Sequence, residues 1–260
     1  MKRNYLHEMR YWSETRRFMK RSFRVRFGKS AHEHMHGGPV LHDKAKCFTC
    51  RKPLRLVWNI NLADSRFIGP LRETFQNLER LPLYYCFNCP EATTYQVVSN
   101  TSVRCMDSEG TDGGDETPYM CETSVPAELP LKPLRLTPLP SAIDALMVLA
   151  NEIDFEMLDA SAQQQIAQFL GREVSMTSDF DISQFGGQLT LPQGQQENNC
   201  PNPRCPVKKL PYYLDGDDFR MKELAVVQQE AVAGFKWVYA PIHYHVCWVC
   251  GTLQGNFACG

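Results

Sequence analysis

Eight of the eleven cysteines in the sequence form four close pairs whose spacing is typical of a metal site. Three pairs have the spacing C-x2-C, and one has the spacing C-x4-C. A short turn of this kind, here called a knuckle, directs two thiolates to one point, and two knuckles supply the four soft ligands of a tetrahedral zinc ion. The spacing predicts two structural zinc ions, one bound by Cys47, Cys50, Cys86 and Cys89, the other by Cys200, Cys205, Cys247 and Cys250.

Paired cysteines have other uses, and the sequence leaves them as alternatives. Disulfides form in oxidising compartments, which nothing in the sequence indicates, and the number of cysteines is odd. A redox C-x2-C pair usually accompanies a βαβ unit, and an iron–sulfur cluster usually has a tighter run of cysteines. Zinc is therefore favoured. In the second set, which has the wider knuckle, the alternative is two unrelated pairs of cysteines.

The remaining cysteines stand apart from these sets. Cys105 and Cys121 flank the acidic, glycine-rich segment 107–117 and could meet across it, but isolated cysteines usually behave as small buried hydrophobic residues. Cys259 has no partner in the pattern and is interpreted as a bystander.

In each of two groups, histidines recur at every second residue. His32, His34 and His36 would lie on one side of an extended segment and could hold a metal, but a dense polar run is more often a solvated loop. His243 and His245 precede Cys247 on an expected strand. One of them could bind zinc or donate a hydrogen bond to a thiolate, and the alternative is a surface or half-buried strand position.

No pattern of catalytic residues accompanies the cysteines. The sequence has no phosphate-binding Walker loop, no G-x-S-x-G nucleophile motif and no H-E-x-x-H metalloprotease motif. A catalytic zinc keeps one coordination position open, whereas four cysteines close each predicted site. We therefore expect structural zinc and no enzymatic activity.

The elements that must position the knuckles are expected to form an α+β, β-rich fold. Proline in the first turn predicts a short helix from residue 70, a candidate N-cap predicts a helix from Ser141, and Gly171 ends a helix over 159–170. Apolar and alternating segments predict strands. The expected strands lie at 54–61, 83–87, 95–99, 224–227 and 242–247.

The order of these features repeats along the chain. Gly37 and Gly38 precede the first knuckle of one half, and Gly186 and Gly187 precede the first knuckle of the other. Each half then continues through a strand, an insert, a strand and a second knuckle. This repetition predicts an internal duplication of about 150 residues and a pseudo-symmetric pair of zinc-binding modules.

Charge and proline content divide the chain further. Residues 1–30 carry ten lysines and arginines against two glutamates, whereas the whole chain has a net charge of −1. Five prolines fall within 126–140, which is typical of a stiff linker. The predicted domains are a basic N-terminal arm at 1–30, a first zinc-binding module at 31–125, a Pro-rich linker at 126–140 and a second zinc-binding module at 141–260.

The motifs resemble a known family. Gly37, Gly38 and Pro39, the pair Cys47 and Cys50, and the run from Leu81 to Cys89 resemble the YwqG-like family of uncharacterised bacterial proteins. The similarity covers residues 36–100 and 183–259, departs from the family pattern after Gly187, and extends distantly to cysteine-rich proteins of the programmed-cell-death-2 type. It implies a duplicated, β-rich α+β fold without an agreed activity, and some relatives are thought to act as immunity or partner-binding proteins.

These observations together predict a zinc-binding scaffold for protein–protein interaction, immunity-like or chaperone-like in role. The alternative is a nucleic-acid-binding protein that uses residues 1–30, where basic side chains would contact phosphates and aromatic side chains would stack on bases. No apolar run is long enough for a transmembrane segment, and no leader pattern is evident, so we expect a cytoplasmic protein.

Overall fold

The structure is a computed structural model of the 260-residue chain. It describes residues 19, 21–67, 70–89, 92–107, 125–146, 158–171, 182–187, 200–206, 221–228, 231–234 and 241–257. Three predictions lie outside this part of the chain: most of the basic arm, the acidic segment after residue 107, and the surroundings of Cys121 and Cys259.

The eleven strands of the described residues form one sheet in which each strand pairing is antiparallel, which makes the protein β-rich as expected. Their order is β4-β3-β2-β7-β1-β8-β9-β10-β11-β5-β6. The bounds are β1 Phe23–Phe27, β2 His34–Gly38, β3 Arg55–Asn61, β4 Arg80–Tyr85, β5 Thr93–Ser99, β6 Ser102–Met106, β7 Leu129–Pro138, β8 Gln184–Phe185, β9 Lys222–Val227, β10 Ile242–Val246 and β11 Thr252–Phe257.

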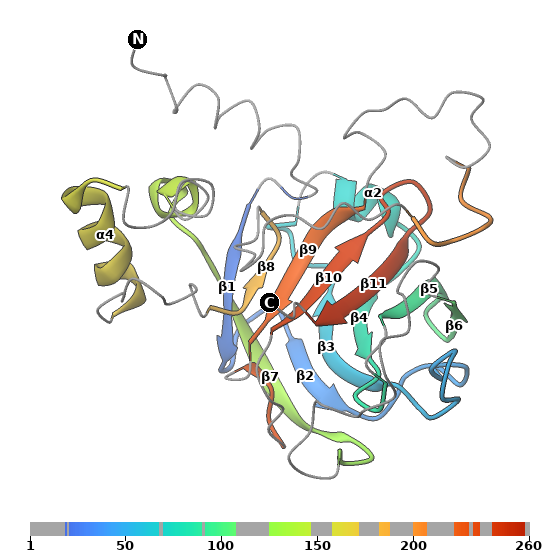
Figure 1. The fold of residues 1–260 in the computed structure, drawn as a ribbon. Helices are drawn as coiled ribbons and strands as arrows, with labels where there is room; N and C mark the ends of the chain where they lie inside the picture. Colours follow the sequence, from blue (N-terminus) through green and yellow to red (C-terminus); the bar gives the residue numbers. More distant parts are fainter. Residues whose placement is uncertain are drawn as a thin grey trace.

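The sheet curls so that β9, β10 and β11 lie over β2, β3 and β4, with the core between them (Figure 1). Contacts across this core join distant parts of the chain. The indole nitrogen of Trp58 donates to the carbonyl of Ala231 at 3.4 Å, and the rings of Tyr85 and Phe257 meet edge to face at 4.8 Å. Apolar side chains from both halves of the sequence therefore form one continuous core.

The structure corrects the prediction of a Pro-rich linker at 126–140. Residues Leu129–Pro138 form β7, which pairs with β2 on one side and with β1 on the other. Its alternating burial leaves Leu134 and Leu136 in the core and Arg135 exposed. Proline lacks a backbone N–H donor, but a strand needs that donor only where the carbonyl of a neighbouring strand faces it. A high proline content therefore did not exclude a strand here, and the composition alone did not reveal it.

The strand order has a two-fold regularity. The run β4-β3-β2-β7 on one side of the sheet corresponds to β10-β9-β8-β1 on the other, each strand to the strand six places away in the chain. The two runs meet where β7 pairs with β1. In consequence β2 pairs with β7 rather than with β1, and β8 pairs with β1 rather than with β7.

The register shifts within the two runs of strands also correspond. The pairing of β3 with β4 shifts register at Val57, and the pairing of β9 with β10 shifts register at Leu224. Both residues are buried, and each occupies the extra position of a β-bulge. The glycine pairs correspond as well, since Gly37 and Gly38 end β2 and Gly186 and Gly187 follow β8.

The helices are short and lie outside the sheet. The expected helices are present as α2, Pro70–Thr74, as a helical segment at 141–146, and as α4, Ala160–Leu170. The side chain of Asp159 caps α4 by accepting from the amide of Ala162, and Gly171 ends it in the left-handed conformation. Among the described helices, none has the length and apolar character needed to cross a membrane.

Candidate metal centres

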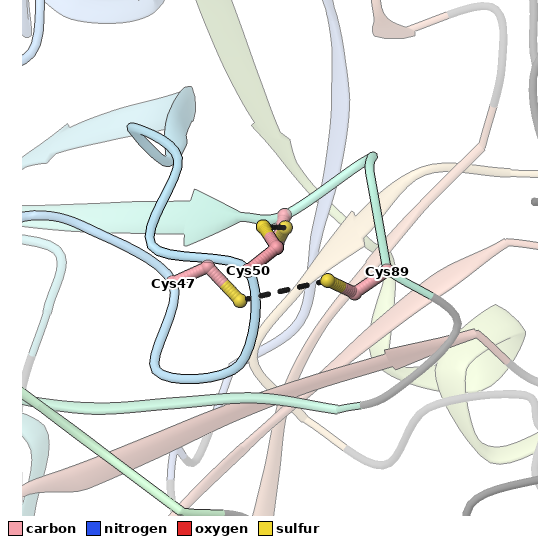
Figure 2. A group of neighbouring side chains, drawn as sticks. Cys47, Cys50 and Cys89 are labelled. Atoms are coloured by element: carbon pink, nitrogen blue, oxygen red, sulfur yellow. Dashed lines mark hydrogen bonds between the residues drawn. The ribbon is translucent and has the colours of Figure 1, made fainter. Parts of the chain in front are cut away.

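Four cysteines from two separate turns meet at the first candidate centre. Cys47 and Cys50 lie in the turn before β3, and Cys86 and Cys89 lie between β4 and β5. Figure 2 shows the sulfur of Cys47 facing that of Cys89 from across the loop. The four sulfur atoms all lie within 4.8 Å of one another, and only Cys50 is more than slightly exposed.

The second candidate centre has the same construction. Cys200 and Cys205 lie in the segment 200–206, and Cys247 and Cys250 lie in the turn that joins β10 to β11. These four sulfur atoms also lie within 4.8 Å of one another. The structure thus brings together both predicted sets of ligands in the predicted combinations.

The separations of the sulfur atoms fit zinc. Cys47 lies 3.8 Å from Cys89, Cys50 3.6 Å from Cys86, and the two corresponding distances of the second centre are 3.6 and 3.7 Å. Four sulfurs at about 2.3 Å from a central Zn²⁺ form a tetrahedron with edges of about 3.8 Å. A disulfide needs about 2.05 Å between its sulfurs, so neither centre is a pair of disulfides.

One knuckle of each centre has the same backbone turn. The amide of Cys47 donates to the carbonyl of Lys52 and the amide of Arg51 donates to the carbonyl of Cys47. The equivalent bonds in the other centre run from Cys247 to Thr252 and from Gly251 to Cys247. Arg51 and Gly251 both have left-handed backbone, with φ of 60° and 68°. This turn places the two sulfurs of each knuckle on the same side.

Side chains around the second centre hold its sulfurs in place. The amide nitrogen of Asn202 lies 3.6 Å from the sulfur of Cys250 and donates to the hydroxyl of Thr252 at 3.2 Å. That hydroxyl lies 3.0 Å from the same sulfur. Hydrogen bonds of this kind orient metal ligands and stabilise thiolates. Neither residue was predicted, because an asparagine and a threonine beside cysteines have no distinctive spacing.

The crowding of the sulfur atoms controls their ionisation. Hydrogen bonding with Cys86 lowers the pKa of Cys47 to about 5 against the opposing effect of burial, and burial raises the pKa of Cys89 to about 12. In the second centre, hydrogen bonding with Cys200 and Cys247 lowers the pKa of Cys250. Each centre therefore favours one thiolate by itself, and a divalent cation supplies the positive charge that lets the other thiols ionise.

His34 and His36 are buried and form hydrogen bonds within the fold. His34 and His36 are buried in β2, so the interpretation of this run as a solvated loop is wrong for them. The ring of His36 lies 2.9 Å from the carbonyl of Pro130 and accepts from the amide of Ala233 at 3.2 Å. The ring of His34 accepts from the amide of Asn61 and lies 3.0 Å from the carboxylate of Asp64. Neither ring has a nitrogen left for a metal.

His243 and His245 are buried on β10, and neither belongs to the four-sulfur groups. Within the described part of the chain, both ring nitrogens of His245 lack a hydrogen-bond partner. Cys105 lies apart from both centres, half-buried against the core, and burial raises its pKa to about 11. This position against the core agrees with the interpretation of Cys105 as a small apolar residue.

Comparison with known proteins found no matching family model, no matching curated protein and no matching solved structure. The resemblance to the YwqG-like family therefore stays a prediction, and the two centres must be interpreted from their own geometry.

Proposed function

We propose that each cysteine group binds one structural Zn²⁺ and that the protein is a zinc-fastened scaffold for protein–protein interaction rather than a catalyst. The observation that carries the proposal is that four thiols surround one point in each centre at separations suited to tetrahedral zinc. With four protein ligands, no coordination position is left for water or substrate, which is the arrangement of structural zinc.

The position of each centre explains what zinc contributes. The first joins the loop before β3 to the turn between β4 and β5, and the second joins the segment 200–206 to the turn between β10 and β11. Each metal ion would therefore fasten two segments that are distant in sequence. Because the unfolded chain has no preformed site, the binding free energy of zinc adds to the stability of the fold.

An internal duplication explains why there are two such centres. It is supported by the corresponding strand orders and by the corresponding bulges at Val57 and Leu224. Strands β1 and β7 are exchanged between the two halves. On this interpretation the ancestral unit was a zinc-binding module that paired through its first strand.

Aromatic side chains at the tips of the knuckles support an interaction role. Phe48 and Trp248 are the second residues of the two turns that share a backbone conformation, and they are 39% and 41% exposed. Most large apolar side chains of the described chain are buried, so a rigidly held and exposed aromatic is a favourable anchor for a protein partner.

Metal analysis of the purified chain tests the proposed centres. The wild-type chain is expected to contain two zinc ions, and Cys86→Ser is expected to contain one and to unfold at a lower temperature, because three thiolates hold zinc far more weakly than four. Cys105→Ser, which changes a cysteine outside both centres, is the matched control. An unchanged zinc content in Cys86→Ser would contradict the proposal.

The scaffold role is tested separately by affinity capture from the native cell with the wild-type chain and with Phe48→Ser and Trp248→Ser. Both substitutions are at exposed positions and should leave the zinc content at two. A defined partner captured by the wild-type chain and lost in either variant is expected. Capture that is equal in all three proteins would place the interaction elsewhere and contradict the role of the knuckle tips.

A further inference from the structure

The turn from Cys47 to Cys50 lies in a short segment that is rich in positive charge. Residues 43–52 contain three lysines and one arginine against a single aspartate. The four basic side chains are all exposed, and they are Lys44, Lys46, Arg51 and Lys52. None of them forms an ion pair within the described residues. Lysine and arginine carry positive charge at neutral pH, so this surface attracts anions.

Hydrogen bonds within the segment hold these cations on one compact turn, which forms the loop between Cys47 and Cys50 in Figure 2. The amide of Cys47 donates to the carbonyl of Lys52 at 2.9 Å, and the amide of Lys46 donates to the carbonyl of Lys44 at 2.8 Å. A bridge also pairs Lys46 with Pro53. The two ends of the segment therefore run side by side, which gathers its charges around the tip of the turn.

An aromatic ring lies among these charges. Phe48 is 39% exposed at the tip of the turn. The guanidinium carbon of Arg51 lies 4.7 Å from the centre of the Phe48 ring, which is within the range of a cation–π contact. A ring that is held by a guanidinium and partly open to solvent is a platform for a nucleobase, because every base has a planar face that can stack.

The backbone at Arg51 suits glycine, yet the position holds an arginine. Its φ is 60°, a left-handed conformation that residues other than glycine rarely adopt. In the turn of the second centre that has the same backbone, this position is Gly251, with a φ of 68°. Strain of this kind concentrates at functional sites, where the surrounding structure maintains it. A binding role for the guanidinium explains why this position is an arginine.

The aromatic tip of the second centre lacks this charge. The turn from Cys247 to Thr252 contains no lysine, arginine, aspartate or glutamate, although Trp248 at its tip is 41% exposed. Each of the two turns holds two cysteines of a four-sulfur group, so the sulfur atoms alone do not require cations at the tip. The positive charge is therefore specific to the surroundings of Phe48, where it indicates an anionic ligand.

We propose that the tip of the first knuckle binds single-stranded nucleic acid. A base would stack on Phe48, and Arg51 and the lysines would contact the phosphates on either side of it. The acidic side chains of a peptide or the headgroups of a membrane would meet the charge, but they lack a planar group to stack on the ring. The inference goes beyond the scaffold role, and because its test uses the purified chain, its failure is distinguishable from a failure of protein capture.

The salt dependence of binding tests the contribution of the charges. The full chain, purified with zinc, is titrated into a labelled oligouridine of about 12 nucleotides, a usual site size, and fluorescence anisotropy is measured at several salt concentrations. Each phosphate contact with a single strand adds about −0.7 to the slope of log K, the association constant, against log salt concentration. Lys46→Gln combined with Lys52→Gln should make the slope less steep by about 1.4. Arg135→Gln, which removes an exposed arginine of β7 outside the knuckle, is the matched control and should leave the slope unchanged.

The contribution of the ring is tested by Phe48→Leu, which keeps an apolar side chain but removes the aromatic face. Loss of one stacked base should weaken binding about tenfold, while the salt slope stays as in the wild type because no charge is lost. Trp248→Leu makes the equivalent change at the uncharged turn and should bind as the wild type does. Double-stranded RNA of equal length should bind more weakly than the single strand, because its paired bases are not free to stack on a side chain.

Arg51→Gly separates binding from structure. The substitution removes a cation and relieves the left-handed strain, so binding should weaken while the unfolding temperature stays equal or rises. Zinc content should equal that of the wild type in every variant, whatever the number of ions. A loss of zinc in the double lysine variant would show that these cations neutralise the thiolates instead, and would overturn the proposal.

The proposal is also overturned if the oligouridine does not bind at micromolar protein concentration, or if the duplex binds as tightly as the single strand. Binding that persists unchanged in the lysine, Arg51→Gly and Phe48→Leu variants would assign the contact to another surface, such as residues 1–30. Preferential binding of anionic lipid vesicles or of polyglutamate would identify a membrane or an acidic protein as the partner, and would contradict the proposal as well.

Discussion

At the scale of single residues, His36 is a polar side chain that is buried because the chain itself supplies its hydrogen-bond partners. His36 bridges the carbonyl of Pro130 and the amide of Ala233, so one ring nitrogen donates, the other accepts, and the ring is neutral. Burial lowers the pKa of His36 to about 4 despite the hydrogen bond to Pro130. A buried neutral histidine links three segments here, but it also makes the fold sensitive to acid.

The pH dependence follows from the direction of that shift. Above the ordinary histidine pKa of about 6.5, both folded and unfolded chains hold a neutral ring. Below it the unfolded chain takes up a proton and the folded chain does not, so His36 lowers the free energy of unfolding as pH falls from about 6.5 to about 4. The slope due to one such residue is at most about 1.4 kcal/mol per pH unit.

His36→Gln should therefore flatten the decline of stability on acidification, whatever its effect on stability at neutral pH. Glutamine can donate and accept as the neutral ring does but does not titrate. Denaturant unfolding of both proteins between pH 7 and 5, with zinc content measured at each pH, checks the prediction. Parallel declines in the two proteins, at equal zinc content, would mean that His36 is not the group responsible.

At the scale of elements, patterns within a few residues predicted helices and strands well. Elements whose place depends on distant strands were not predicted. The helix that ends at Gly171 and the strands beside the cysteines were identified because caps, alternation and knuckles act over a few residues. Strand β7 was missed because prolines dominate its composition, while its place depends on the carbonyls of β1 and β2.

Close contact between β2 and β7 makes Gly37 indispensable. Gly37 has a φ of 64°, and a Cβ there would lie 2.5 Å from the carbonyl oxygen of Pro130. Gly171 at the end of α4 has a similar φ of 73°, but a Cβ there would meet nothing within 4 Å. The two positions therefore separate the cost of the backbone conformation from the cost of the clash.

Gly171→Ala should destabilise the protein by about 1 kcal/mol, the cost of a left-handed alanine. Gly37→Ala should cost roughly 3 kcal/mol or more, because a backbone carbonyl must also move. Chemical denaturation of the two variants and the wild type measures both. Equal losses in the two variants would show that β7 can retreat from β2 at little cost.

At the scale of the whole molecule, the pairing of β1 with β7 and β8, and of β7 with β2, joins two halves that the sequence suggested were separate modules. The sequence pattern of knuckles and glycines is local and repeats in each half, so it indicates two units. The partners of β2 and β8 lie about 100 and 160 residues away along the chain, and no local pattern reports such pairings. The core confirms the connection, because residues of both halves fill it together.

A fragment of residues 31–125 should therefore remain unfolded even with saturating zinc, although it holds all four cysteines of the first centre. It lacks β7, which pairs with the whole length of β2, and it lacks β9, β10 and β11, which cover Trp58 and Tyr85. Mixing fragments 1–125 and 126–260 with zinc should restore the fold, because together they supply every strand. Amide proton dispersion in NMR spectra distinguishes the outcomes. A dispersed spectrum from fragment 31–125 alone would show that zinc and local pairing suffice, and that β1 and β7 only join two independently folded modules.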